Sequence, residues 1–408
     1  MSRRLALAVD ESAWIRHQIL ATHKMGMRIF INALSARLGG GQTYLLNLLE
    51  HVPQGIDLQV FVLAQPSFQL GTLPKNVVRL ERASLENPFL RAAWEEVCLA
   101  PLLKRLNIDL FFSPGGLLPR SLPKNMLTAV TFQNMLPFDC VQRAKYPYGY
   151  RRIRDWLLER GLSSSMRRAD VVVFISEFAK KFIHHRLDRL HGRSEVIPHG
   201  IHPSFRVHPG APLPRPDWLP KGDYFLYVSF IDHYKAQLEV IRGFNFYRLQ
   251  GGAGKLLLVG SEYRPYGDLV RKEIANLGLT EAVLMPGGVP HNQLPAAYQH
   301  AQVNIFASFT ENCPNILLEM MASGRPALVS SWGPMPEFGG EAVDYFDPAS
   351  PEDFAHHLAK LVMNEERQRY LASAAVEQVA GYTWQNASRL TWGVLLEGYQ
   401  SAKVGQQR

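Results

Sequence analysis

The strongest structural pattern in the chain lies in the stretch Val303-Asn-Ile-Phe-Ala-Ser-Phe-Thr-Glu-Asn-Cys-Pro-Asn-Ile-Leu-Leu-Glu-Met-Met-Ala-Ser-Gly-Arg-Pro326. Its first five residues, apolar apart from one asparagine, predict a short buried strand. From Ile316 onwards apolar residues recur at helical spacing, and Gly324 follows where the helix is expected to end. Asn312 is a suitable N-cap, and Pro314 fits the first turn. The stretch therefore predicts a strand, a loop and a helix, the repeating unit of parallel α/β domains.

The same alternation of strand-like and helix-like segments occurs along most of the chain, in two series. The first series of predicted strands covers residues 27–33, 58–63, 76–80, 109–112, 127–132, 171–175 and 195–197. The second covers 224–229, 255–260, 282–285, 303–306 and 327–330. A proline-rich stretch from Pro203 to Pro220 separates the two series and is typical of a linker. We therefore predict an α/β fold with two Rossmann-like domains that face each other across a cleft.

Composition is that of an ordinary globular protein of 408 residues, 47% hydrophobic and 20% charged. Cys98, Cys140 and Cys313 are widely spaced, so neither a disulfide framework nor a zinc site is expected. A reducing, cytoplasmic compartment is the default expectation, and no stretch has the length of a membrane-spanning helix. Residues 1–26 contain a short apolar run that two acidic residues interrupt, so we expect a mobile extension, or a natural start at Met25 or Met27.

The chain is basic, with a net charge of +8 and an isoelectric point near 9.3. Much of the excess lies between Arg143 and Arg193. Aromatic residues are not interleaved with these cations in the manner of single-strand binders, so no nucleic-acid partner is expected. An anionic membrane surface, with a peripheral location on it, or an acidic acceptor is the preferred interpretation. Solvated helix faces are the alternative.

Two carboxylates in the opening stretch point to a ligand. Glu311 falls in the predicted loop and Glu319 about two turns into the helix, which separates the carboxylates by very roughly 10 Å. The helix N-terminus between them favours an anion, and carboxylates bind hydroxyl groups. A diphosphate with a sugar at each end, that is, a nucleotide-sugar, fits this arrangement. The alternative is that both glutamates are solvated surface charges.

With its continuation to Pro348, this stretch resembles the donor-site motif of the retaining glycosyltransferases of family 4 (GT4), which have the GT-B fold. The resemblance covers roughly residues 27 to 400 and is strongest from 282 to 348. It implies an acceptor-side domain at 27–205, a nucleotide-sugar-binding domain at 206–385 and a C-terminal helix at 386–408 that packs on the first domain. It also implies transfer of a hexose, with retention, from a GDP- or UDP-linked donor to a saccharide or lipid-linked acceptor, as in the synthesis of bacterial surface polysaccharide or lipopolysaccharide. Neither a metal nor a cofactor is expected.

The resemblance extends to three further motifs of the donor site. Gly39, Gly40 and Gly41 follow the first predicted strand, where relatives face the donor diphosphate; a plain tight turn is the alternative. Lys235 aligns with the lysine that neutralises the diphosphate, and the arginine common beside it is missing. In the turn 286–290, backbone atoms contact the base in relatives. The implied donor-binding residues are Gly39, Gly40, Gly41, Lys235, Gly288, Val289, Glu311, Asn315, Ile316 and Glu319.

The catalytic centre of the first domain departs from the family pattern. Gln133 and Asn134 stand where many relatives carry His-Asp, and neither amide titrates, so neither can act as a general base. With Glu311 and Lys235 they complete the candidate catalytic set, in which the amides orient groups and the departing phosphate takes the acceptor proton. Asp139 is a nearby carboxylate that also fits a turn. A nucleotide-sugar epimerase and a non-catalytic nucleotide-sugar-binding protein remain as alternative functions.

Overall fold

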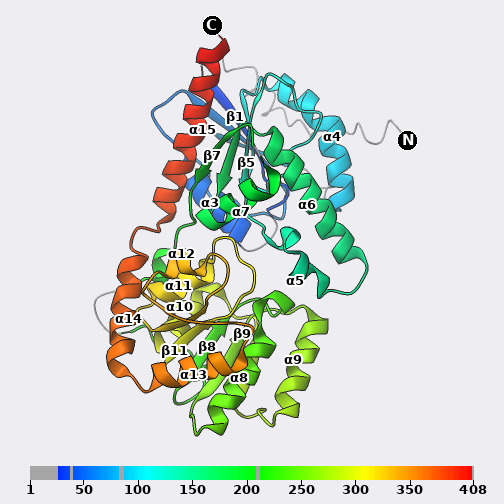
Figure 1. The fold of residues 1–408 in the computed structure, drawn as a ribbon. Helices are drawn as coiled ribbons and strands as arrows, with labels where there is room; N and C mark the ends of the chain where they lie inside the picture. Colours follow the sequence, from blue (N-terminus) through cyan, green and yellow to red (C-terminus); the bar gives the residue numbers. More distant parts are fainter. Residues whose placement is uncertain (1–25, 37–39, 82–86, 189, 208–211, 407–408) are drawn as a thin grey trace.

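The computed structural model describes residues 26–36, 40–81, 87–188, 190–207 and 212–406. The expected extension at 1–26 therefore lies, apart from Gly26, outside the described residues. Two parallel sheets form separate halves of the molecule, one above the other in Figure 1. None of the helices within the described ranges is both long and apolar enough to cross a membrane.

The first half contains a seven-stranded parallel sheet in the order β3-β2-β1-β4-β5-β6-β7. Its strands are β1 (Met27–Asn32), β2 (Leu58–Ala64), β3 (Val77–Glu81), β4 (Leu110–Ser113), β5 (Leu127–Phe132), β6 (Val171–Phe174) and β7 (Arg193–Val196). The helical segments are α3 (Gly40–Glu50), α4 (Pro88–Arg105), η1 (Leu136–Phe138), α5 (Cys140–Ala144), α6 (Tyr150–Arg168) and α7 (Glu177–Leu187). The short segment η2 (Pro203–Phe205) follows in the chain but packs on the second half, where Phe205 joins the apolar core.

The second half contains a six-stranded parallel sheet in the order β10-β9-β8-β11-β12-β13. Its strands are β8 (Tyr224–Val228), β9 (Lys255–Val259), β10 (Val283–Gly287), β11 (Val303–Phe306), β12 (Ala327–Ser330) and β13 (Asp344–Phe346). The helical segments are η3 (His233–Lys235), α8 (Gln237–Leu249), α9 (Arg264–Asn276), η4 (His291–Gln293), α10 (Leu294–His300), α11 (Asn315–Ala322), α12 (Met335–Gly339), α13 (Pro351–Val362) and α14 (Glu365–Gln378). Two parallel sheets with covering helices are the α/β fold that the sequence predicts.

The first sheet is buried on both faces because successive side chains of a strand point to opposite sides. In β1, Ile29 and Ile31 belong to one apolar cluster, whereas Phe30 belongs to the other. The first cluster includes residues of α3 and of the last helix, α15 (Trp384–Gln406). The second lies under α4, α6 and α7. Strands covered on both faces explain why the apolar runs of the sequence are nearly continuous.

The last helix, α15, returns from the second half of the molecule to the first, as Figure 1 shows in red. Trp392 is buried, and its indole N–H donates to the carbonyl of Leu48 at 2.9 Å, which fixes α15 against α3. The segment before α15 passes close to Gly200. Ile201 N–H donates to Tyr382 O at 2.9 Å. This bond ties the segment that leads into α15 to the segment after β7, which connects the two halves.

Each sheet reverses its strand order once, and ligands of such sheets bind outside the carboxyl ends of the strands at that point. In the first sheet the reversal lies between β1 and β4, and in the second between β8 and β11. The connections that leave these strands carry the described part of the glycine loop, Gly40 and Gly41 at the start of α3, then Lys235 after β8 and Glu311 after β11. The topology therefore places the candidate residues at the two switch points.

Candidate functional site

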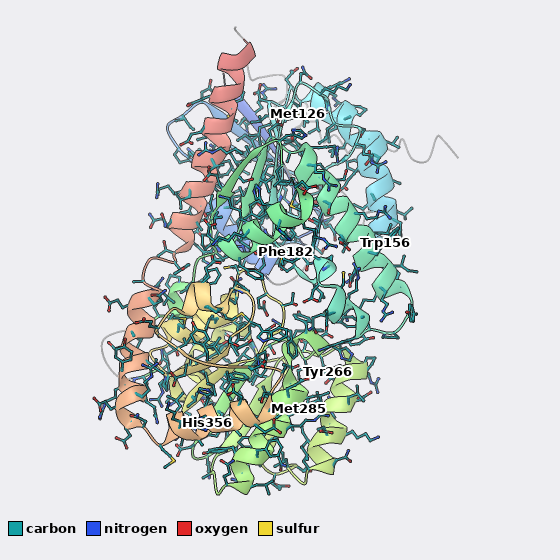
Figure 2. All side chains as sticks on the ribbon, viewed as in Figure 1. Met126, Trp156, Phe182, Tyr266, Met285 and His356 are labelled. Carbon is teal, nitrogen blue, oxygen red and sulfur yellow. The ribbon has the colours of Figure 1, made fainter. Side chains whose placement is uncertain are left out.

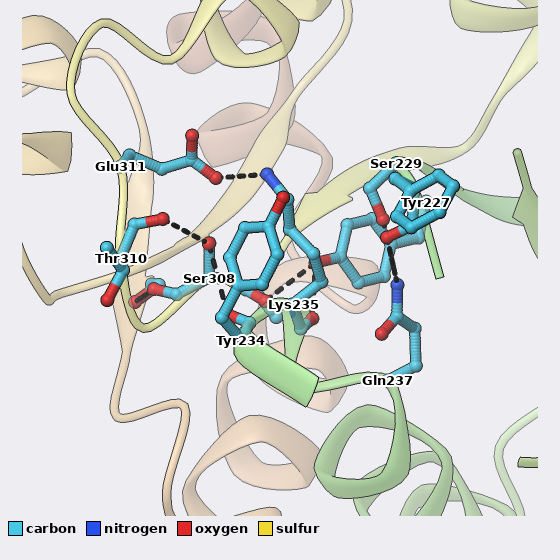
Figure 3. A network of polar contacts seen from close by, with 11 residues as sticks. Tyr227, Ser229, Tyr234, Lys235, Gln237, Ser308, Thr310 and Glu311 are labelled. Carbon is cyan, nitrogen blue, oxygen red and sulfur yellow. Dashed lines mark hydrogen bonds and ion pairs between the residues drawn. The ribbon is translucent and has the colours of Figure 1, made fainter. Parts of the chain in front are cut away.

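Lys235 and Glu311 meet at the second switch point, where they form an ion pair (Figure 3). Lys235 ends the short segment η3, and its side chain is buried beside the rings of Tyr234 and Phe306. Burial by itself would lower the pKa of Lys235, but the carboxylate of Glu311 outweighs it, and the pKa is raised. The lysine is therefore a fixed cation that faces the loop after β11.

The N-terminus of α11 lies next to the glycine loop of the other half. A Cβ atom placed on Gly40 would be 3.4 Å from Asn315 Nδ2, and one on Gly41 would be 4.0 Å from Gln133 Oε1. The first intrahelical bond of α11 runs from Leu318 N–H to Pro314 O at 3.1 Å, and the N–H of Asn315 donates to Cys313 O at 2.9 Å. The N–H groups of Ile316 and Leu317 therefore remain at the open end of the helix. Gly39 lies outside the described residues.

His199 holds the side chain of Asn315 in place. Its Nδ1 lies 3.1 Å from Asn315 Oδ1, and its ring is within 5.5 Å of the Tyr44 ring and 5.2 Å of the Trp384 ring, measured between centroids. Burial lowers the pKa of His199 to about 4, so the imidazole is neutral at physiological pH. A neutral histidine thus joins α3, α11 and α15 at one point and leaves the amide nitrogen of Asn315 near the glycine loop.

Glu319 contacts His291, which follows the predicted base-binding turn. Its Oε1 lies 3.4 Å from His291 Nε2. Burial raises the pKa of Glu319, whereas the bond to Glu319 raises the pKa of His291. In the same turn, a Cβ atom placed on Gly288 would lie 3.1 Å from Ser261 Oγ, and the side chain of Val289 packs against the apolar core. Ile316, in the first turn of α11, packs against the same core. His291 escapes sequence reasoning because an isolated histidine in a turn carries no pattern.

Gln133 and Asn134 differ in their surroundings. Gln133 is half-buried, donates from Nε2 to Pro114 O at 3.2 Å and faces Gly41. Asn134 is exposed, and its Oδ1 accepts a bond from Leu136 N–H at 3.2 Å, which makes it part of a local turn. The structure thus brings Gln133 to the glycine loop and gives Asn134 a local backbone contact.

Asn312 does not cap α11, contrary to the prediction, because its buried amide is used between the two halves. Its Nδ2 donates to Phe132 O at 2.9 Å, and its Oδ1 accepts from Ser176 Oγ at 3.1 Å. The helix consequently begins at Asn315, with Pro314 at the cap position. Next to Asn312, the hydroxyl of Thr310 donates to Asp139. The loop that carries Glu311 is therefore held against the first half of the molecule.

Asp139 acts as a turn residue as well as a partner of that loop. One of its carboxylate oxygens caps α5 by accepting from Gln142 N–H at 2.9 Å, and the other accepts the Thr310 bond. A further carboxylate, that of Glu337, accepts from the N–H groups of Glu177 and Phe178 at 2.7 and 2.8 Å, at the start of α7. Anions are favoured at such helix starts. These contacts close the two halves on one another.

Asp232 is the most deeply buried carboxylate at the contact between the halves. It accepts bonds from Tyr146 OH at 2.8 Å and from Arg151 Nη2 at 2.7 Å, both from the first half. The Arg151 guanidinium also lies 3.7 Å from the centroid of the Tyr146 ring. Tyr146 and Arg151 are more than 80 positions from Asp232 in the sequence, so no local pattern could have revealed the cluster.

The arrangement combines a cation, a helix N-terminus and two carboxylates around a glycine loop. Such a site can neutralise a diphosphate and hold hydroxyl groups on either side of it. In the part of the chain that the structure describes, no group of three or more His, Cys, Asp or Glu side chains could hold a metal ion.

Two protein families match the chain. The family described as "Glycosyltransferase Family 4" matches residues 38–205, and "Glycosyl transferases group 1" matches residues 215–378. Among curated proteins, the chain is similar to D-inositol 3-phosphate glycosyltransferases. It is 27% identical to that of Nocardia farcinica over 181 residues and 29% identical to that of Corynebacterium diphtheriae over 115 residues. These alignments cover 41% and 28% of this chain, and only 36% and 27% of the relatives.

Solved structures show the same fold over about nine tenths of the chain. Sucrose-phosphate synthase from Thermosynechococcus elongatus has a TM-score of 0.70 at 17% identity, covering 92% of this chain and all of that one. The lipopolysaccharide glycosyltransferase WaaG has a TM-score of 0.67 at 14% identity, covering 90% and 99%. Anabaena HepE, solved with UDP, has a TM-score of 0.64 at 15% identity, covering 91% and 100%.

Proposed function

We propose that this chain, which belongs to the group 1 glycosyltransferases of family 4 and has their GT-B fold, transfers a hexose from a nucleotide-sugar to a saccharide or lipid-linked acceptor. The observation that carries the proposal is the approach of Gly40 to Asn315 in the first turn of α11, the helix that carries Glu319, together with the buried Lys235–Glu311 pair. We place the diphosphate between the helix start and the lysine. The structural neighbour HepE, solved with UDP, supports a nucleotide donor.

The two carboxylates take the two ends of the donor in this proposal. Glu319 binds the ribose hydroxyls beside Val289, and Glu311 binds hydroxyls of the transferred sugar. Lys235 and the N–H groups of Ile316 and Leu317 stabilise the charge that develops on the leaving diphosphate. Asn315 and Gly41 line the same space, and Gln133 faces the reacting sugar from the first domain.

Transfer proceeds with retention and without a metal in this proposal. The bond between the anomeric carbon and the diphosphate oxygen breaks, and the acceptor oxygen bonds to the same face of the sugar. The acceptor proton passes to the departing diphosphate, because the amide of Gln133 cannot accept it. Gln133, and Asn134 if its turn opens, orient hydroxyl groups. A cytoplasmic role in the synthesis of a surface polysaccharide or lipopolysaccharide is the setting that we propose.

Substitution of the two carboxylates tests the donor assignment. A thermal-shift screen with GDP, UDP, ADP and their sugars first identifies the donor. Glu319→Ala should then lose nucleotide affinity, whereas Glu311→Gln should bind nucleotide but lose turnover. The exposed Glu281 offers a matched control, Glu281→Gln, that should behave as the unsubstituted protein. Near-normal kinetics in both site variants would contradict the proposal.

Product analysis separates the remaining alternatives. Conversion of the nucleotide-sugar without any acceptor would indicate an epimerase. Calorimetric binding of nucleotide without turnover on a broad acceptor panel would indicate a non-catalytic binding protein. The anomeric configuration of the glycoside, measured by NMR before mutarotation, decides between retention and inversion, and full activity in the presence of a chelator is expected.

A further inference from the structure

The solvent-facing side of α6 is apolar over its first two turns. Ile153, Trp156 and Leu157 have the i, i+3, i+4 spacing of one helix face and are 59%, 45% and 46% exposed. The turn before the helix adds Tyr148, which is 92% exposed, and Tyr150 opens the helix. Figure 2 shows Trp156 at the outer edge of the first domain. A surface helix ordinarily presents polar residues on this side, so this face needs an explanation.

The neighbouring helix α4 repeats the pattern. Phe89, Leu90 and Val97 are all more than half exposed. A hollow of about 440 Å³ separates the two helices, with Ala92 of α4, Leu117 and Leu118 of the β4 loop, and Trp156 and Leu157 of α6 in its walls. We call the exposed apolar residues of both helices, together with this hollow, the α4–α6 face. Clusters of exposed apolar residues mark interaction sites.

Cations without acidic partners surround the apolar residues. Asp155 pairs with Arg154, and Glu159 pairs with Arg143 and Arg186, so the carboxylates of α6 are already neutralised. Arg160, by contrast, lies over the Trp156 ring at 4.5 Å from its centroid, and Arg167 is exposed further along the helix. Within the described ranges, no carboxylate forms an ion pair with either arginine. The face therefore carries net positive charge.

The two acidic residues of the hollow, Glu95 and Glu96, offset only part of this charge, because three arginines, Arg120, Arg160 and Arg168, line the same hollow. Glu95 accepts from Asn32 Nδ2 at 3.0 Å, and Glu96 accepts from the N–H groups of Arg120 and Ser121 at 2.9 and 3.2 Å. Arg168, in the same wall, donates to the carbonyls of Leu118 and Pro119. The arginines of the hollow thus outnumber its carboxylates, and Arg160 is exposed.

We propose that the α4–α6 face docks on the surface of an anionic lipid bilayer. Tryptophan and tyrosine rings with apolar neighbours suit the boundary between headgroups and acyl chains, and arginines that lie over those rings reach the lipid phosphates. Because the face is positively charged, it should bind an anionic bilayer more tightly than a neutral bilayer or a protein surface with few acidic residues. A hollow at the start of α6 is lined by Tyr150 and Arg151 and by Phe230 and Tyr263 of the second domain, so a docked face brings the junction of the two domains to the bilayer. A docked enzyme could take a lipid-linked acceptor directly from the bilayer, and this part of the inference rests on the proposed function. The docking itself does not depend on the proposed function.

Vesicle flotation without nucleotide tests the docking on the full chain. The protein should float with vesicles of phosphatidylcholine and phosphatidylglycerol at low salt. High salt should release it from these vesicles, and it should not float with vesicles of phosphatidylcholine alone. The Arg160→Gln/Arg167→Gln variant should bind at least about tenfold more weakly, since each surface arginine contributes roughly fivefold. Ile153→Ser/Trp156→Ser/Leu157→Ser should lose binding and remain folded, because these side chains are exposed. Leu249→Ser/Met363→Ser, which removes exposed apolar residues of the second domain, is the matched control.

Failure of the unsubstituted chain to float with anionic vesicles at low salt would overturn the docking, as would unchanged flotation of both face variants. A concentration-dependent oligomer that the serine variant abolishes, without any effect on vesicles, would indicate a protein partner instead and would equally overturn it. Nucleotide binding in vesicle-free solution reports on the donor site alone. Failure of the docking and failure of the proposed function are therefore distinguishable.

Discussion

The ammonium group of Lys235 and the carboxylate of Glu311 pair inside the second domain, 76 positions apart in the sequence. Their side chains are only 7% and 14% exposed. In the proposed function, a nucleotide-sugar shares these two charges, with its diphosphate nearest the lysine and its sugar hydroxyls nearest the glutamate. Without a ligand each residue neutralises the other, so the pair also has a structural role.

We therefore expect Lys235→Met to destabilise the second domain. Removal of the ammonium leaves the Glu311 carboxylate buried without a partner, at a cost of about 3–5 kcal/mol. The double variant Lys235→Met/Glu311→Gln should recover a large part of that loss while it stays inactive. Urea unfolding of the double variant and of both single variants gives the three free energies of unfolding. If the loss in the double variant equals the sum of the two single losses, the pair does not couple.

The strands and the loops that carry the candidate residues could be predicted from the sequence, because they depend on local patterns. Every predicted strand overlaps an observed one, whereas β13 is only three residues long and has no periodicity of its own to detect. The contacts between the domains could not be predicted. Asn312 is a good N-cap by type, yet its amide bonds to Phe132 and Ser176, which lie 180 and 136 positions away. When a side chain can form either a local or a distant hydrogen bond, the tertiary structure determines which one forms. A local sequence pattern does not contain that information.

Gly200→Ala should loosen the crossover to the first domain. A Cβ on Gly200 would lie 2.0 Å from Trp384 N and 2.3 Å from the carbonyl carbon of Thr383, and backbone atoms cannot turn away as a side chain can. We expect a loss of about 2–3 kcal/mol or more, as for other overpacked sites. Gly381→Ala in the same segment is the control, because a Cβ there has nothing within 4 Å. Thermal unfolding gives the stability, and faster hydrogen exchange in α15 would locate the damage; equal stabilities of the two variants would refute this account.

Gly40→Ala should separate binding from folding. The added methyl group would meet Asn315 Nδ2 at 3.4 Å, an ordinary contact, and alanine suits the first turn of α3, so stability should change by less than about 1 kcal/mol. The methyl group would nevertheless occupy the space in which we place the diphosphate. Calorimetry should show nucleotide-sugar binding weakened by about tenfold or more, as for a lost close approach of backbone to ligand. Gly393→Ala, in α15 with nothing near its Cβ, should leave affinity unchanged.

Asp232→Asn should weaken the closed arrangement of the two domains. The carboxylate is buried and accepts from Tyr146, Arg151 and the His233 N–H group. Its replacement leaves the guanidinium of Arg151 without a counter-charge, which should cost about 2–4 kcal/mol at this contact. Small-angle scattering of the ligand-free protein should show a larger radius of gyration. Asp268→Asn, which removes an exposed partner of Arg271, should leave the scattering curve unchanged.

Nucleotide-sugar affinity should rise with pH through the titration of His291. In the empty site, the bond to Glu319 raises the pKa of His291 above 6.5, so the pair stabilises the free protein at low pH and this contribution is lost as the pH rises through the raised pKa. A ribose that takes the Glu319 oxygen removes the partner of His291, and binding then releases a proton. Affinity should therefore increase between about pH 6 and 8, by up to tenfold for each unit of pKa shift. Calorimetry with an intact nucleotide-sugar, whose diphosphate does not titrate in this range, measures it. His291→Gln should flatten the dependence of affinity on pH. His356 is exposed, and His356→Gln should leave this dependence unchanged. If the dependence persists in His291→Gln, another group is responsible for the titration.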